Sequence, residues 1–554
     1  MDWQGRAHFT FFDADYGDGR RCASLVAQWR ADPARSQRLH VIALAPAGTS
    51  SMLPGFHRIP QPDSAVTLDL LAAPLTEALA QLTASLDAIR LHGIGTAAAD
   101  FARPLARITA LGARLDGAGL NAVQLAALRA QGFLFDAGTQ QARFASRKPR
   151  LPAPPSLEKR AIVIGAGLAG TAACERLCAR GWDVTLVERH ATPAMEASGN
   201  RAGIFMPLLS RDDNIPTRLT RAAYLYALRY WNTLGGIGSK IDGAACGVLQ
   251  LARDPAHADV QRALARERAH PPGFAAWLER ADAEAVLGHP APDGGWLFRQ
   301  GGWARPASVC AAMLEACGAR LSRRFDSGSV HVMREGDAWR VIDEAGITLA
   351  SAATVILANG PGARAIAQAA TLPLAAVRGQ VTHLDAAHAP ALPLVLCREA
   401  YITPPWGGVC SFGASYDADA DPALRMASQD ANLANIRDLL QDPTIGIGAP
   451  LRGRVGFRCV APDRLPLAGA LPDVDAAGGT ERLRDVPRHP GLYSLLGYAS
   501  RGLIWAPLAA ELLAARLDGD PLPLEANLVD ALDPARFVLR ARRIQQKPTG
   551  GDDF

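Results

Sequence analysis

The sequence predicts a smaller α/β domain followed by a larger one of mixed α/β and α+β class, and three observations support this prediction. The motif VIGAGLAG lies at residues 163–170 of 554, far from the start of the chain. Before it stands SRKPRLPAPPSLEKR (146–160), whose four prolines resist both helix and strand. Near the C-terminus, a strand-like run leads through a second glycine turn (497–502) into a helical pattern.

These observations predict a linker at residues 151–158 that separates two domains. In the first domain, residues 1–150, the strand-like runs HFTFFDA (8–14) and RLHVIALA (38–45) alternate with helical segments, which predicts an α/β fold. The second domain spans residues 159–545. We predict Rossmann-type cofactor-binding parts at 159–240, 350–375 and 455–520, and an inserted antiparallel substrate domain at 241–350 and 376–454.

Composition excludes several classes of protein. No apolar run reaches membrane-spanning length, and MDWQGRAHFTFF lacks the pattern of a secretory leader, so we expect a cytoplasmic protein with no membrane partner. The nine cysteines form no CxxC pair, so we predict neither a disulfide framework nor a metal site. The net charge of +4 is small. The sequence does not determine the oligomeric state.

The glycines of GAGLAG stand where a dinucleotide-binding turn needs them. Gly165 permits the tight turn, Gly167 lets the backbone approach a pyrophosphate, and Gly170 allows helix and strand to pack closely. Glu188 ends the next predicted strand, where its carboxylate can accept hydrogen bonds from ribose hydroxyls. The pattern predicts a dinucleotide cofactor and leaves NAD and FAD open.

The C-terminal turn separates these two cofactors. GYASRGLIWAP (497–507), with Gly497, Ser500 and Gly502, resembles the turn that contacts the flavin in the amino-acid oxidase class of flavoproteins. FAD is therefore the expected cofactor. Other blocks in the same order, among them EASGNRAGIFMPLLS (196–210) and GRVGFRCVAPDRLPLAG (453–469), resemble the oxidoreductase half of the tRNA 5-methylaminomethyl-2-thiouridine biosynthesis bifunctional proteins. This resemblance covers residues 158–520.

The resemblance implies oxidation at the wobble uridine of tRNA. The carboxymethyl group of 5-carboxymethylaminomethyl-2-thiouridine would be removed to leave 5-aminomethyl-2-thiouridine. By similarity to the wider glycine-oxidase group, the substrate carboxylate would meet Arg458, Tyr401 and Arg501, with Tyr416 as a further candidate. Each residue also has a structural interpretation: an interdomain salt bridge for Arg458, a buried strand tyrosine for Tyr401 and a cation at a helix start for Arg501. The cofactor would be reached by Ser198, Gly199 and Asn200, and Arg378 to Gln380 could lie near its ring.

Residues 8–150 resemble the Rossmann-like methyltransferase half of the same family, with three departures. Asp15 replaces a glycine of the loop after the first strand, VIALAPAG lacks the acid expected at the end of the second, and His92 replaces the aspartate that faces the reacting amine. We therefore predict a degenerate domain that does not use S-adenosylmethionine. Two alternatives stay open: the full bifunctional enzyme, and a small-molecule glycine or sarcosine oxidase with an N-terminal interaction domain.

Two basic segments are candidates for tRNA contact because nothing in the sequence indicates that they are buried. FASRKPRLP lies at the predicted linker, and RFVLRARRIQQK (536–547) lies near the C-terminus. Phosphate neutralisation by Lys and Arg supplies much of the affinity of proteins for RNA.

Overall fold

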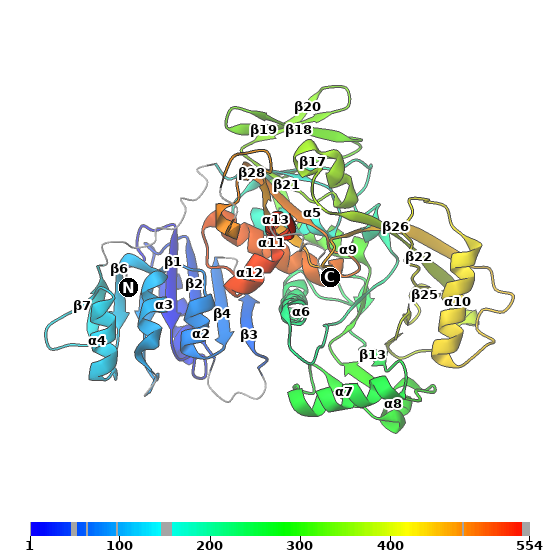
Figure 1. Ribbon diagram of the computed structural model, residues 1–554, viewed down its shortest axis with the longest axis horizontal. Coiled ribbons are helices and arrows are strands. Elements are labelled where there is room, and N and C mark those ends of the chain that lie inside the picture. The colour runs from blue at the N-terminus through cyan, green and yellow to red at the C-terminus, as the bar shows by residue number, and fades with distance from the viewer. Residues whose placement is uncertain are drawn as a thin grey trace, which may run out of the picture. The chain divides into compact units, whose positions relative to one another are not determined.

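The computed structural model describes residues 2–45, 52–61, 65–95, 98–145, 158–478 and 481–545 (Figure 1). Most of the predicted linker and the segment SRKPRLP lie outside these residues. The chain divides into two compact units. Unit 1 comprises residues 1–157, 228–233 and 511–529, and unit 2 comprises the rest. None of the helices in the described ranges is long and apolar enough to cross a membrane.

Unit 1 is built on a single sheet of strand order β3-β4-β2-β1-β5-β6-β8-β7. Its parallel centre consists of β4 (Val66–Ala72), β2 (Arg38–Leu44), β1 (His8–Asp13), β5 (Leu86–Arg90) and β6 (Thr109–Asp116). The antiparallel strands are β3 (Gly55–Pro60) at one edge, β7 (Phe133–Phe135) at the other edge, and β8 (Gln141–Phe144) between β6 and β7. β1 and β2 are buried at every position after the first, which is typical of parallel strands covered on both faces.

Alternation along β1 divides the core of unit 1 into two layers. Phe11 belongs to a cluster with Trp29 of α1 (Arg20–Ala31), whereas the next residue, Phe12, belongs to the opposite cluster. That second cluster contains apolar residues of α2 (Leu75–Gln81), α3 (Ala102–Arg107) and α4 (Ala122–Ala130). The result is the α/β fold that the sequence predicts for this region.

Unit 1 also contains a segment from near the C-terminus. Arg58 of β3 donates to both carboxylate oxygens of Asp69 on β4, at 2.8 and 2.7 Å, and to Glu511 Oε1 at 2.8 Å. All three side chains are buried. We predicted that residues 511–529 belong to the second domain (159–545), but they belong to unit 1. The sequence could not indicate this, because an ion network between distant parts of the chain leaves no local pattern.

Unit 2 contains a six-stranded sheet of order β17-β10-β9-β21-β28-β27. Its strands are β17 (Leu321–Arg324), β10 (Asp183–Val187), β9 (Arg160–Ile164), β21 (Thr354–Leu357), β28 (Arg488–Leu496) and β27 (Leu467–Pro472), of which only β27 is antiparallel to its neighbour. α5 (Leu168–Cys178) and α9 (Pro306–Ala316) pack together beside it. We predicted β17 within the substrate part; this was wrong, because LSRR is a short polar edge strand without an apolar pattern.

The substrate part of unit 2 is an eight-stranded, largely antiparallel sheet of order β14-β15-β13-β23-β24-β25-β22-β26 (Figure 1). β26 (Arg452–Val460) pairs with β22 (Ala375–Asp385) from Ala375 to His383, so the predicted boundary at residue 455 cuts through one strand and was misplaced. The other strands of this sheet are β14 (Ala276–Leu278), β15 (Gly295–Phe298), β13 (Val248–Leu251), β23 (Val395–Cys397), β24 (Tyr401–Ile402) and β25 (Val409–Gly413).

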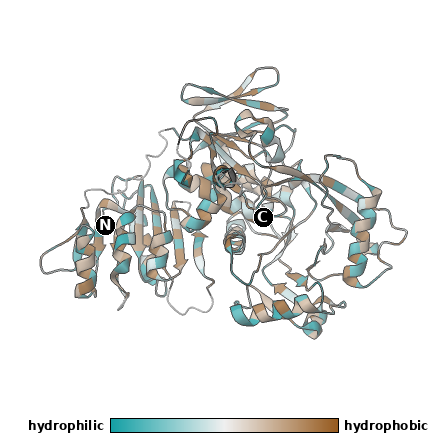
Figure 2. Cartoon of the chain, viewed as in Figure 1, coloured by the Kyte–Doolittle hydropathy of each residue, from teal (hydrophilic) through white to brown (hydrophobic). Residues whose placement is uncertain are grey.

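Two small sheets and several helices complete the chain. The sheets are β11 (Gly203–Phe205) with β16 (Gly302–Ala304) and β12 (Gly243–Ala244), and β18 (Val330–Glu335) with β19 (Ala338–Asp343) and β20 (Thr348–Ala352). The remaining helices are α6 (Ile215–Thr233), α7 (Pro255–Arg268), α8 (Arg280–Leu287), α10 (Met426–Leu440), α11 (Gly502–Asp518), α12 (Ala526–Leu532) and α13 (Arg536–Gln545). α11 is hydrophobic along most of its length (Figure 2), and both α6 and α11 contribute residues to both units.

Candidate active site

The first glycine turn connects β9 to α5 at the carboxyl end of the parallel strands. Gly165 has φ of 105°, and a Cβ there would lie 2.7 Å from the carbonyl oxygen of Ala358. A Cβ on Gly170 would lie 1.8 Å from the carbonyl oxygen of Gly165. The chain leaves β9 for β10 on one side, and β21 lies on the other side, which makes the turn a topological switch point of the kind that binds dinucleotides.

The N-terminus of α5 is completed by two polar side chains. Glu188 follows β10 and is 8% exposed; its two oxygens accept from the N–H groups of Ala166 at 2.6 Å and His190 at 3.0 Å. Ser198 Oγ accepts from the N–H of Leu168 at 3.1 Å. A carboxylate oxygen offers two acceptor sites, so Glu188 retains capacity for the ribose hydroxyls of FAD. The arrangement fits the predicted cofactor.

Arg454 of β26 holds the loop that contains Ser198, Gly199 and Asn200. Its Nη2 donates to the carbonyl oxygens of Met195 at 2.6 Å and Glu196 at 2.7 Å, and its Nη1 donates to Asn200 Oδ1 at 3.3 Å. A Cβ on Gly199 would lie 2.6 Å from the backbone carbonyl oxygen of Ala194, so glycine is required at this close approach. Sequence analysis missed Arg454, although alternation along β26 places it on the same face as Arg458.

The second glycine turn lies beside the first. Gly497 follows β28 with φ of 75°, and α11 begins at Gly502 after the exposed Ser500. A Cβ on Gly502 would lie 3.3 Å from Leu168 Cδ1 at the start of α5. Two helix N-termini therefore come together at this edge of the sheet, where their free N–H groups and partial positive charge suit the phosphates of FAD.

Gly170→Ala should abolish flavin binding, because the added methyl cannot be placed without moving backbone that forms the turn. We expect the purified variant to lose its bound flavin, as measured by absorbance near 450 nm. Gly273→Ala serves as control, since a Cβ there meets nothing within 4 Å. A yellow Gly170→Ala protein with normal flavin content would contradict the assignment.

Arg458, also on β26, is a half-buried cation that the protein does not neutralise. Its Nη1 donates to the carbonyl oxygen of Ser415 at 3.0 Å, and its guanidinium lies 4.9 Å from the ring centre of Tyr416. Among the described residues no carboxylate lies within ion-pair distance of it, and burial lowers its pKa. A buried guanidinium without a counterion is costly unless a ligand supplies the anion.

Tyr401 and Arg501 lie in the same neighbourhood as Arg458. Burial raises the pKa of Tyr401 to about 12, and the nearby Arg458 charge acts in the opposite direction. Tyr401 pairs across strands with Cys397, whose thiolate form would interact with Arg501. Arg501 Nη1 donates only weakly, at 3.5 Å, to the carbonyl oxygen of Met206, and burial lowers the pKa of Arg501. Tyr401 therefore lies near the charge of Arg458, and Arg501 lies near Cys397, the cross-strand partner of Tyr401.

Two further predicted positions have structural roles. Arg378 is fully buried, forms an ion pair with Asp417 at 3.0 Å and donates to the carbonyl oxygens of Asp421 at 2.8 Å and Ala423 at 2.6 Å. It therefore fixes the loop after β25. Gln380 Oε1 accepts from Arg378 Nη2 at 2.9 Å and is also fully buried.

A cluster that the sequence did not reveal lies next to the cofactor loop. The guanidinium of Arg201 lies 4.7 Å, and that of Arg305 5.3 Å, from the ring centre of Trp406, which is also 6.3 Å from Trp303. In the described part of the chain, Arg201 Nε, Trp303 Nε1 and His383 Nε2 are buried and make no hydrogen bond. Burial, followed by the charge of Arg201, lowers the pKa of His383 to about 4, so this ring is neutral. Each buried polar group without a partner requires an explanation, such as an ordered water, a bound ion or a catalytic role.

Charged pairs fill the corresponding switch point of unit 1, between β1 and β5. Arg90 donates from Nη2 and Nε to the two oxygens of Asp13, at 2.6 and 3.1 Å. Asp15 Oδ1 accepts from the N–H of Gly17 at 3.0 Å, and Asp15 Oδ2 lies 2.6 Å from Arg21 Nη2. These carboxylates are satisfied by the protein itself.

The basic C-terminal segment is partly structural. Arg536 is buried and donates to both oxygens of Asp463, at 2.9 and 3.0 Å, and Arg540 donates to the same carboxylate at 2.6 Å. The expectation that this whole segment is free for tRNA was therefore wrong, because its first two arginines form ion pairs with Asp463 and Arg536 is buried. Arg543 is exposed.

Comparison with known proteins agrees with this site. The sequence matches the family described as FAD dependent oxidoreductase over residues 160–516, a range that includes both glycine turns and all three carboxylate-binding candidates. The fold and the site thus define a flavin-dependent oxidoreductase.

Curated proteins similar to this chain match it over nearly its whole length. It is 40% identical to the tRNA 5-methylaminomethyl-2-thiouridine biosynthesis bifunctional protein MnmC of Azoarcus sp. (strain BH72), with 98% of this chain and 92% of the relative covered. The protein of the same name from Burkholderia thailandensis is 39% identical, with the same coverage. The chain belongs to the family of tRNA 5-methylaminomethyl-2-thiouridine biosynthesis bifunctional proteins.

Solved structures share the fold of the oxidoreductase part. Glycine oxidase from Geobacillus kaustophilus has a TM-score of 0.57 at 20% identity and covers 68% of this chain and 99% of its own. Iminodiacetate oxidase from Chelativorans sp. BNC1 has a TM-score of 0.52 at 23% identity, with 66% and 96% covered.

Proposed function

We propose that this chain oxidatively removes the carboxymethyl group from 5-carboxymethylaminomethyl-2-thiouridine in cytoplasmic tRNA, giving 5-aminomethyl-2-thiouridine. The substrate group is an N-substituted glycine, so it carries a carboxylate one carbon away from the amine. One observation supports this proposal best. The guanidinium groups of Arg458 and Arg501 have no acidic partner within the described residues, and Tyr401 lies near the charge of Arg458. The names of the curated relatives supply the tRNA context.

The protein would position the substrate, and bound FAD would supply the two-electron oxidising capacity for the glycyl carbon. Glu188, Ser198 and the two glycine turns would hold the cofactor. Arg458 and Tyr401 would bind the carboxylate and thereby fix the glycyl CH₂ in place. Loss of two electrons and two protons from the CH₂–NH unit gives an imine, and water adds to its carbon to release glyoxylate and the primary amine. A neutral amine requires no dedicated protein base.

We further propose that unit 1 has the fold of a methyltransferase domain and has lost its activity. Its central strand order supports the fold, and the ion pair of Asp13 with Arg90 at the switch point supports the loss. The second candidate is the full bifunctional enzyme, in which unit 1 still binds S-adenosylmethionine. Two observations favour this candidate: the relatives are named as bifunctional proteins, and the match with this chain covers 92% of the length of each relative.

Nucleoside mass analysis tests both proposals. The FAD-loaded protein is incubated with tRNA that carries the carboxymethylaminomethyl group, with and without S-adenosylmethionine. We expect the aminomethyl nucleoside in both samples. A methylaminomethyl nucleoside only in the second sample would contradict an inactive unit 1, and an unchanged nucleoside together with turnover of free N-methylglycine would replace the tRNA substrate by a small molecule.

A further inference from the structure

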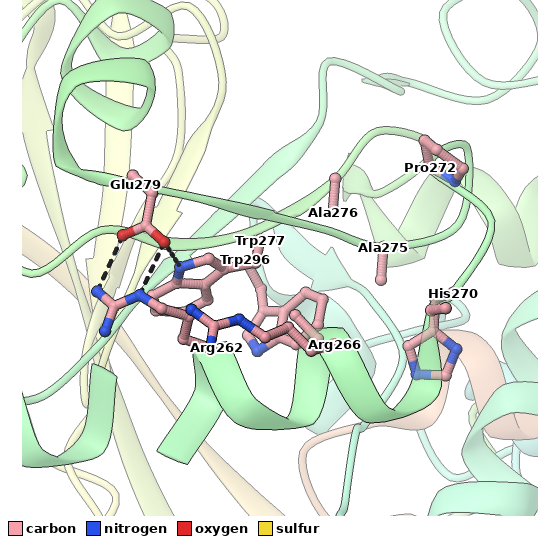
Figure 3. A pocket seen from close by; sticks show the side chains of 11 residues that line it. Arg262, Arg266, His270, Pro272, Ala275, Ala276, Trp277, Glu279 and Trp296 are labelled. Carbon is pink, nitrogen blue, oxygen red and sulfur yellow. Dashed lines mark hydrogen bonds and ion pairs between the residues drawn. The ribbon is translucent and has the colours of Figure 1, made fainter. Parts of the chain in front are cut away.

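A pocket in the substrate part of unit 2 contains none of the residues proposed for catalysis or cofactor binding. It has a volume of about 320 Å³ and lies between α7 and β14 (Figure 3). Aromatic and basic side chains line it together with small residues. The main ones are Arg262, Arg266, His270, Trp277, Glu279 and Trp296.

The aromatic rings of the pocket are held in fixed orientations. Trp277 and Trp296 meet edge to face, with ring centres 5.9 Å apart, and His270 lies 6.3 Å from Trp296. Both indole N–H groups are bonded: Trp277 Nε1 donates to Glu279 Oε1 at 3.1 Å, and Trp296 Nε1 donates to Gln261 Oε1 at 2.7 Å. Trp296 is buried, whereas Trp277 is only half-buried. The ring of Trp277 is therefore partly accessible to a ligand, while its N–H group is already hydrogen-bonded within the protein.

The two arginines of the pocket differ in their electrostatic surroundings. Arg262 donates to both oxygens of Glu279, at 2.7 and 2.9 Å, and to Asp259 at 2.6 Å, so its charge is neutralised. Arg266, one helical turn further along α7, is exposed and has no ion pair within the described residues. Burial, followed by nearby Arg221, lowers the pKa of His270, so its ring is uncharged at neutral pH. One available positive charge thus lies beside an aromatic surface.

We propose that this pocket binds one unpaired nucleotide of the tRNA substrate other than the modified uridine, with the base against Trp277 and His270 and a phosphate on Arg266. This proposal rests on the tRNA substrate of the proposed function. The single-stranded loops of an RNA offer unstacked bases, which proteins bind by stacking them on aromatic side chains. Such stacking tolerates any base, and an arginine neutralises the phosphate.

The pocket is tested by tRNA binding to the FAD-loaded protein without turnover, measured by filter binding over a series of salt concentrations. Trp277→Ala should weaken binding by about 5- to 150-fold, the range for loss of one stacked base. Trp277→Phe keeps an aromatic ring and should stay within about 3-fold of the unchanged protein. Arg266→Ala should reduce the slope of log K against log salt by about 0.7, as expected for loss of one single-strand phosphate contact.

Arg320→Ala provides the matched control. It removes an exposed arginine, paired with Asp183 at 2.9 Å, that does not line the pocket. The proposal would be overturned if Arg266→Ala and Arg320→Ala have the same tRNA affinity and the same salt slope, and if Trp277→Ala binds tRNA as tightly as the unchanged protein. The proposal would also be overturned if inorganic phosphate binds at Arg266 while the pocket variants bind tRNA with unchanged affinity. The pocket would then be an anion site only.

Failure of the pocket and failure of the proposed function are distinguishable. If the unaltered protein converts the nucleoside while the pocket variants bind tRNA normally, the pocket proposal fails and the function stands. If the unaltered protein binds tRNA through Trp277 and Arg266 without converting it, the pocket stands and the reaction fails. Flavin content and melting temperature of each variant show that its fold is retained. Where Trp277→Ala is unstable, the test rests on Arg266→Ala, which changes an exposed side chain.

Discussion

Arg458→Ala should retain bound FAD and lose about 10²- to 10³-fold in kcat/KM, because a substrate carboxylate would be buried without its charged partner. In the structure the guanidinium donates to the carbonyl oxygen of Ser415 at 3.0 Å and has no acidic partner within the described residues. Steady-state kinetics with carboxymethylaminomethyl-containing tRNA measures the loss, and absorbance near 450 nm measures the flavin.

Two variants define what that loss means. Arg458→Lys keeps the charge but not the planar fork of donors, so its activity should lie between the unaltered protein and Arg458→Ala. Arg452→Ala removes an exposed arginine of the same strand and should leave kcat/KM unchanged. Normal turnover by Arg458→Ala would remove this residue from the site.

Arg58→Ala should destabilise unit 1 by about 3–5 kcal/mol, because it removes the guanidinium that pairs with the buried carboxylates of Asp69 and Glu511. The two units need not unfold together, so hydrogen exchange of the β2 and β4 amides is a better measure than one melting temperature. Arg20→Ala breaks an exposed ion pair with Asp18 and should cost no more than about 1 kcal/mol.

The same network predicts a pH dependence with a definite sign. Burial alone would raise the pKa of Asp69, but Arg58 and then His40 lower it to about 2. Asp69 has a pKa of about 3.9 in an unfolded chain, so its contribution is present above that pH and is lost as the pH falls towards 2. Unit 1 of the unaltered protein should lose exchange protection over this range, and Arg58→Ala should lack that component. Equal acid sensitivity in the two proteins would contradict the assignment to Asp69.

Local patterns predicted the parts of the fold that local physics determines. The turn at Gly165 to Gly170 and the helix that follows it are recognisable because close backbone approaches exclude every other residue. β17 was misassigned because an exposed, polar edge strand has no periodic signal. Residues 511–529 were misassigned because their partners, such as Arg58, are hundreds of residues away.

The candidate site shows the same division. Arg458 and Tyr401 could be proposed because they lie within blocks that resemble a known family. Arg454 and the cluster around Trp406 could not, because their significance comes from contacts with the cofactor loop: with Asn200 for Arg454, and with Arg201 for Trp406. Such contacts are formed between segments about two hundred residues apart, and no spacing rule within one segment reports them.

The presence of Glu511 and its neighbours in unit 1 limits how this gene can be rearranged. The segment that encodes residues 1–157 does not encode the whole compact unit, since residues 511–529 complete it. A deletion or exchange of the front segment alone would strip one end of α11 of its packing partners in that unit, and a fragment ending at residue 157 would leave Arg58 facing a missing carboxylate. A compact unit built from separate stretches of the chain cannot be removed whole by one deletion that spares the residues between those stretches.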